Sequence, residues 1–262
     1  MLMKSILLFL LASISFSGFS QHGQIGTFIP IDMPMKSEMP KMGTNIGIGF
    51  SGAYSPFYTA PLFLELKASW GNYSSKTLRQ TYLFDDGSQT TTDVSYTSSM
   101  HKYLIGTKVM IGRDYRAVRG FITPQIGLAN FKTKIVIADP LDEDGCQALD
   151  RETTHRFAGF VYGGEMGAQI SMEKLFKGIS SENTHKLTIS ASYLSGFNHF
   201  EYVNVRYMQD EVHDTQVTHT SGDINARFIN VSTNQIHEHK IAELYHTNLR
   251  MIGINIGYVV NF

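Results

Sequence analysis

The chain ends in the segment 251-MIGINIGYVVNF-262, in which two different faces of a β-strand alternate. Side chains two residues apart lie on the same face of a strand. One face of this segment is wholly apolar and consists of Ile252, Ile254, Ile256, Tyr258, Val260 and Phe262. The other face is small or polar apart from Met251 and Val259. Such a strand suits a membrane barrel, where the apolar face contacts lipid and the small polar face lines a narrow, wet lumen.

The same alternation recurs along the chain, in segments close to the length of about 10 residues that a transmembrane strand needs. The further segments are residues 45–51, 62–71, 102–111, 122–129, 160–170 and 187–193. Together with the last strand they number seven, whereas a single-chain bacterial barrel has an even number of strands. The pattern therefore requires one more strand, and residues 24–31 are the best candidate, with Pro30 expected at the strand end.

The lengths of the intervening segments predict the topology, because such barrels have short periplasmic turns and long external loops. The short links are residues 53–60, 113–119 and 173–185. The long links, expected as external loops, are residues 72–99, 132–156 and 198–247. An all-β, closed, antiparallel up-and-down barrel of eight strands follows. Ten strands are the alternative if the last long link contains another hairpin around residues 226–232.

The first twenty residues have the pattern of a cleaved secretory signal peptide. Lys4 precedes an apolar run over residues 6–16, and Gly18 and Ser20 occupy the small-residue positions of a cleavage site. Residues 21–262 are then expected to form one outer-membrane β-barrel domain. Cys146 is the only cysteine, which excludes an intramolecular disulfide framework.

The composition excludes several other classes of protein. The 262 residues have a net charge of −1 and include 23 Gly, 17 Phe and 13 Tyr. A mean hydropathy of −0.11 is too low for a bundle of transmembrane helices. With 42% hydrophobic and only 17% charged residues, the chain is too apolar for a disordered protein. The neutral charge balance favours no nucleic-acid partner.

The terminal strand ending at Phe262 resembles the C-terminal signal strand of bacterial outer-membrane β-barrels. The patterned chain as a whole resembles the small, OmpA-like eight-stranded barrel superfamily, and its N-terminal and Tyr/Gly-rich sequence is similar to exported proteins of Bacteroidota. The resemblance implies location in the cell outer membrane, contact with outer-membrane lipid, and recognition of Phe262 by the barrel-insertion machinery.

Charged residues are expected inside this barrel, since they alternate with the lipid-facing positions. The inward set is Glu65, Lys67, Lys102, Lys108, Glu165 and Gln169. Eight strands leave an interior that side chains just fill. Unpaired buried charges are costly, so the sequence predicts a paired, hydrogen-bonded plug and argues against a diffusion porin. A proton or ion relay through the same glutamates and lysines is the alternative interpretation.

Three segments carry residues that are typical of metal sites. His237 and His239 lie on one side of a strand without a regularly spaced third ligand, so solvated histidines are favoured. Met33, Met35, Met39 and Met42 resemble the methionine ladders that bind Cu(I), although an amphipathic external turn is favoured. The acidic run at residues 139–144 lacks the spacing of a calcium loop.

One trio of residues hints at enzyme chemistry. His219, Ser221 and Glu238 resemble the His-x-Ser plus Glu arrangement of outer-membrane lipid A deacylases. A histidine activates a serine only within hydrogen-bond reach and with an orienting acid. The trio lies in an expected loop and not on a patterned strand, so catalysis is disfavoured.

The sequence thus predicts an outer-membrane barrel with a plugged lumen and a structural or binding role in the cell envelope. External loops on such a rigid scaffold commonly carry recognition surfaces, so an unidentified protein partner is expected there. No catalytic, cofactor or metal-binding residue is assigned. The alternative functions are an enzyme acting on lipid A and a narrow solute or metal channel.

Overall fold

The computed structural model describes residues 23–56, 61–83, 89–112, 117–138, 148–175, 185–204, 223–229 and 236–262. The strands are β1 (Gly23–Pro34), β2 (Asn45–Tyr54), β3 (Leu62–Leu83), β4 (Gln89–Ile111), β5 (Val118–Ala138), β6 (Ala148–Ser171), β7 (His185–Asn204), β8 (Asp223–Ile229) and β9 (Ile236–Asn261). A single helical turn, α2 (Met172–Leu175), follows β6. The expected signal peptide at residues 1–20 lies outside the described residues.

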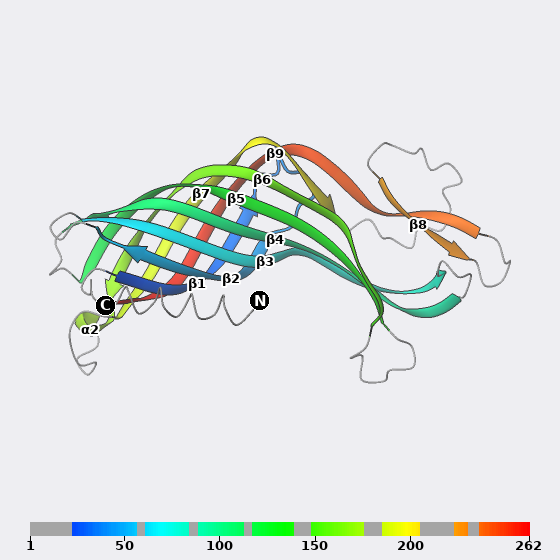
Figure 1. Ribbon diagram of the computed structural model, residues 1–262, viewed down its shortest axis with the longest axis horizontal. Coiled ribbons are helices and arrows are strands. Elements are labelled where there is room, and N and C mark those ends of the chain that lie inside the picture. Colours follow the sequence, from blue (N-terminus) through cyan, green and yellow to red (C-terminus); the bar gives the residue numbers. More distant parts are fainter. Residues whose placement is uncertain are drawn as a thin grey trace, which may run out of the picture.

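The strands form a closed antiparallel ring in which β1 to β7 each pair with their neighbours in the chain (Figure 1). β7 pairs with β9, and β9 closes the ring on β1 through a ladder from Gln24↔Asn261 to Pro34↔Met251. The ring therefore contains the eight strands β1 to β7 and β9, as the sequence predicted. The hairpin suspected around residues 226–232 exists as β8, but it pairs with β9 over residues 236–243, beyond the ring. The ten-stranded alternative is therefore wrong.

The weakest predicted strand, residues 24–31, is confirmed as β1 but continues to Pro34. Pro30, expected at the strand end, lies inside β1 opposite Asn255 of β9. On its other side the β1–β2 ladder is interrupted between Phe28↔Gly49 and Ile31↔Ile46. Proline has no N–H to donate, so this interruption is where the ring tolerates it.

The predicted long loops are mostly paired strand, which corrects the sequence interpretation. Over residues 72–99, β3 and β4 pair as far as Leu83↔Gln89. Over residues 132–156, β5 and β6 pair as far as Ala138↔Ala148. β7 and β9 likewise pair up to Asn204↔Glu243 within residues 198–247. These strands run well past the ends of β1 and β2 and form a sheet extension on one side of the ring (Figure 1).

The outer face of the ring carries a continuous apolar belt. On β4 it runs from Tyr103 to Ile111, and on β9 from Ile252 to Tyr258, with every second side chain exposed. Aromatic residues mark its two edges. The half-buried Trp70 and the exposed Tyr103 contact each other at one edge, and the exposed Tyr258 and Phe262 lie at the other. A belt about ten residues deep with aromatic rims is the lipid-facing surface of a transmembrane barrel.

Among the described residues, no helix is both long enough and apolar enough to span a membrane.

Candidate functional site

The half of the lumen farther from the extension is filled by a network of ion pairs, here named the polar plug. Lys67 on β3 pairs with Glu165 on β6, and its Nζ lies 3.6 Å from Glu65 Oε2. Glu65 also accepts a hydrogen bond from Lys108 Nζ at 3.0 Å. Ser190 Oγ donates to Glu165 Oε1 at 2.6 Å, which satisfies the second oxygen of that carboxylate. The charges thus neutralise one another across the three strands β3, β4 and β6.

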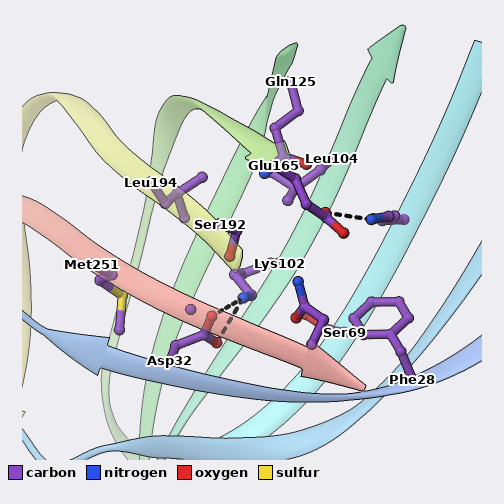
Figure 2. Close-up of a pocket in the computed structure, with 13 residues that line it drawn as sticks. Phe28, Asp32, Ser69, Lys102, Leu104, Gln125, Glu165, Ser192, Leu194 and Met251 are labelled. Carbon is purple, nitrogen blue, oxygen red and sulfur yellow. Dashed lines mark hydrogen bonds and ion pairs between the residues drawn. The ribbon is translucent and has the colours of Figure 1, made fainter. Parts of the chain in front are cut away.

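A second ion pair lies nearer the outer end of the lumen. Lys102 Nζ lies 2.6 Å from both carboxylate oxygens of Asp32, and Figure 2 shows this pair bridging β4 and β1. Asn45 Nδ2 donates to Asp32 Oδ2 at 2.9 Å. All three side chains are buried, so the pair is shielded from solvent. A buried pair of this geometry is tolerated because each charge has a direct partner and further hydrogen bonds.

The space left inside the lumen is small. Two cavities of about 20 Å³ each lie beside the ion pairs, and Phe28, Lys67, Glu165 and Asn255 line both of them. A cavity of this size holds roughly one water molecule. The aromatic rings of Phe28 and Phe121 fill the remaining width, lying 5.6 Å and 4.7 Å from the ammonium groups of Lys67 and Lys108.

The inward set predicted from the sequence is confirmed. Glu65, Lys102, Lys108, Glu165 and Gln169 are buried, and the Lys67 side chain is only 11% exposed. Sequence reasoning missed Asp32, because the predicted first strand ended one residue before it. Alternation would have identified Asp32 once the strand was extended, since it continues the inward row of Gln24 and Phe28.

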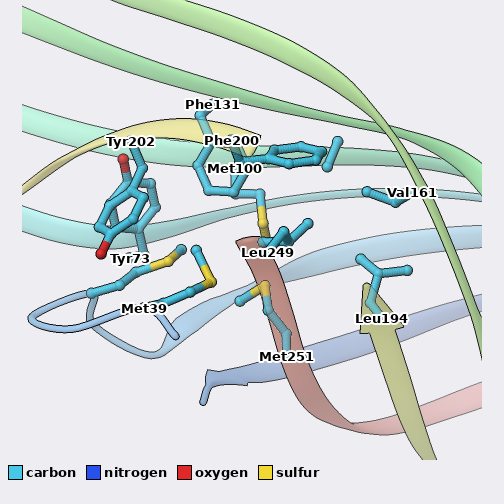
Figure 3. Close-up of a cluster of buried hydrophobic side chains, with 12 residues drawn as sticks. Met39, Tyr73, Met100, Phe131, Val161, Leu194, Phe200, Tyr202, Leu249 and Met251 are labelled. Atoms are coloured by element: carbon cyan, nitrogen blue, oxygen red, sulfur yellow. The ribbon is translucent and has the colours of Figure 1, made fainter. Parts of the chain in front are cut away.

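Above the polar plug, the outer mouth of the barrel is closed by an apolar cluster, here named the apolar seal (Figure 3). Its largest members come from β3, β4, β5, β7 and β9 and are Tyr73, Met100, Phe131, Phe200, Tyr202, Leu249 and Met251. The connection between β1 and β2, residues 35–44, contributes Met39 and Met42, both buried. Removal from water raises the pKa of Tyr73 to about 12.

The β1–β2 connection is held over the mouth by specific contacts. Tyr202 Oη donates to the carbonyl of Pro40 at 2.7 Å, and Met35 N donates to the carbonyl of Arg250 at 2.9 Å. Arg250 Nη1 lies 2.9 Å from Glu38 Oε1. The predicted external turn is confirmed in place, but its methionines do not form a ladder: Met33 faces outward, whereas Met39 and Met42 pack into the seal.

Most of the other candidate residues are not brought together in the described part of the chain. His219, Ser221, Cys146 and the acidic run 139–144 lie outside it. His237, Glu238 and His239 lie on β9 opposite β8, where the backbone alone is described. Among the described residues, no group of three or more His, Cys, Asp or Glu side chains is placed to hold a metal ion.

One histidine cluster in the extension was not singled out by the sequence. Glu201 on β7 lies 3.8 Å from His155 Nε2 on β6 and 3.4 Å from His246 Nδ1 on β9. Burial lowers the pKa of His155 below its ordinary value, although the Glu201 carboxylate acts in the opposite direction. The histidine-rich character of residues 198–247 was the available signal, but only the strand pairing shows which histidines meet.

No protein-family model matches the sequence, and no curated protein matches it. Among solved structures the chain is similar to Ail, the attachment invasion locus protein of Yersinia pestis, determined in complex with the heparin analogue sucrose octasulfate. The two chains share 9% identity at a TM-score of 0.38, over 92% of this chain and 97% of that chain.

The ring, the apolar belt and the filled lumen define the class of protein. Closure leaves no backbone hydrogen-bonding edge exposed to lipid, which a spanning sheet requires. The chain is an eight-stranded antiparallel β-barrel of the outer-membrane class.

Proposed function

We propose that this protein is a non-conducting outer-membrane barrel that acts as a structural or binding element of the cell envelope, through its sheet extension and not through catalysis. The observation that carries the proposal is the double closure of the lumen. The polar plug fills the membrane-embedded half, and the apolar seal covers the outer mouth. A solute would have to displace both to pass.

The extension supports a binding role because it projects a hydrogen-bonded sheet beyond the ring. β3 and β4 pair as far as Leu83↔Gln89, and β5 and β6 pair as far as Ala138↔Ala148. The backbone of a paired strand is already ordered before binding. Binding to it therefore costs less conformational entropy than binding that must first order a loop. The partner under this proposal is an envelope protein or lipid, and the enzyme on lipid A is the less supported function.

The experiment that tests the proposal is conductance of the purified full chain in a planar bilayer. The unmodified protein is expected to show no steady open-pore current. Glu165→Ala should produce brief, low-conductance events, because Lys67 then loses its nearest carboxylate. Glu201→Ala removes the same charge in the extension and is expected to stay silent. A stable, large conductance from the unmodified protein would overturn the proposal and favour the channel.

The export route is part of the same proposal. Residues 1–20 would be removed as a signal peptide, and Phe262 would be read by the barrel-insertion machinery. Phe262 is exposed at the edge of the belt farther from the extension, where a terminal aromatic is accessible before the ring closes. Deleting Phe262 should lower the amount of membrane-inserted, heat-modifiable protein while leaving synthesis and export unchanged. A Bacteroidota origin stays a prediction from the sequence.

A further inference from the structure

Positive charge is concentrated on one side of the extension, on neighbouring strands. Lys132 and Lys134 lie on β5 and Arg156 lies on β6, beside His101 of β4. On β5 the side chains of Ala129, Phe131 and Thr133 are buried on the inner face, so the lysines between them point outward. Lys132 is directly opposite Arg156 in the ladder, which places both on the same outer face.

This basic patch, defined as Lys132, Lys134 and Arg156, begins immediately above the lipid belt. Leu128 is the last exposed apolar residue of β5, and Lys132 lies four residues further along. Four residues span about 13 Å of strand, and less in height because barrel strands are tilted. Lysine and arginine side chains are long enough to reach back toward the membrane surface. The patch therefore lies at the level of lipid headgroups.

The patch is electrostatically uncompensated within the described part of the chain. Like charges directly opposite on a sheet, such as Lys132 and Arg156, destabilise it. No ion pair joins Lys132, Lys134 or Arg156 to a carboxylate among the described residues. Burial, followed by the positive charges of these three residues, lowers the pKa of His101.

On the opposite side of the barrel, the basic residues Arg250 and His246 of β9 lie beside carboxylates. There Arg250 is paired with Glu38 at 2.9 Å, and Glu201 lies between two histidines. Lys132, Lys134 and Arg156 thus form a group of cations on the neighbouring strands β5 and β6, next to a belt that contacts lipid. An anion bound here would relieve the repulsion between Lys132 and Arg156 and would sit against the exposed side chains of Leu128 and Phe160.

We infer that the basic patch binds the phosphate groups of phosphorylated lipids in the outer leaflet. Arginine binds phosphate through paired N–H donors, and lysine supplies a compact positive charge beside it. Continuity between the patch and the apolar belt favours a lipid over a soluble anion, because one molecule can place its phosphate on the patch and its acyl chains on the belt. The inference rests on the proposed binding role of the extension, for which it names the class of lipid, and it holds whether or not the lumen conducts.

The experiment measures lipid binding by the full chain in phosphatidylcholine vesicles that contain increasing fractions of bisphosphorylated lipid A. Trp70 is the only tryptophan, and it lies opposite His101 on the outer face, so its fluorescence reports occupancy of the patch. Each lysine or arginine near an anionic surface strengthens association by about fivefold. Lys132→Gln/Arg156→Gln should therefore weaken binding by about 25-fold.

The matched control is Lys36→Gln/Lys41→Gln, which removes two exposed positive charges from the β1–β2 connection. It should bind like the unmodified protein, and lipid A lacking both phosphates should bind the unmodified protein as weakly as the patch variant does. Equal binding by the patch variant and the unmodified protein would overturn the inference. Saturation of the Trp70 response by inorganic phosphate in detergent, without lipid, would also overturn it, since the patch would then bind a soluble anion.

Discussion

The two halves of the long strands place their apolar side chains on opposite faces. Within the ring, β9 is apolar outside at Ile254 and polar inside at Asn255. In the extension, the same strand is apolar inside at Leu249 and polar outside at Asn248 and Arg250. β5 inverts in the same way between Leu128 and Phe131. The medium outside the sheet changes from lipid to water at this level, so the apolar side chains move to the other face.

This inversion explains how one sheet serves two environments. In the ring, charged side chains have no water outside and pair with one another in the polar plug. In the extension, apolar side chains have no lipid outside and are buried in the apolar seal. The substitutions below test this comparison on each side of the inversion.

The largest effect is expected where a charge is left alone in the polar interior. Lys102→Met removes the partner of Asp32 and should lower the free energy of unfolding by about 3–5 kcal/mol. Asp32→Asn/Lys102→Met should recover most of this loss, because no uncompensated charge remains. Lys36→Met, on the exposed surface of the β1–β2 connection, is the control and should change little. Urea unfolding in lipid vesicles measures all three, and an equal loss in the single and double variants would contradict the pairing.

The apolar seal should be sensitive to loss of volume. Leu249→Ala leaves a cavity among fully buried neighbours and should cost about 2–5 kcal/mol of extension stability. Ile254→Ala on the same strand faces lipid, which fills the space, so its cost should be smaller. Amide hydrogen exchange can separate the two regions. If Leu249→Ala left exchange in the extension unchanged, the seal would not be what holds it together.

A charge placed on the outer face should distinguish lipid from water. Ile254→Arg puts a cation in the belt and should cost roughly 2–4 kcal/mol near the bilayer middle. Asn248→Arg puts the same side chain on the same face of β9, above the inversion, and should be close to neutral. Comparable folding yields of the two variants in vesicles would show that the belt does not end between these positions.

The smallest effect concerns pH and belongs to the extension. The pKa of His155 is lowered by burial, so the unfolded chain binds a proton more readily than the folded one. Extension stability should therefore fall as the pH drops below about 6.5. His155→Gln should flatten this dependence, although His101 contributes in the same direction. Amide exchange at pH 7 and pH 5 measures it, and a slope unaffected by the substitution would assign the dependence to other groups.

The sequence by itself determined the lipid-facing rows, the strands of the ring and the inward charges, because alternation along one strand is local and each face contacts a single medium. It did not identify the extension as strand. The apolar side chains change from one face to the other between residues such as Leu128 and Phe131, so an alternation pattern followed along one face ends there. Only the tertiary structure brought Asp32 to Lys102, Met39 into the apolar seal and Lys132 opposite Arg156. Those contacts depend on the register between strands that are far apart in the chain, and closure of the ring sets that register.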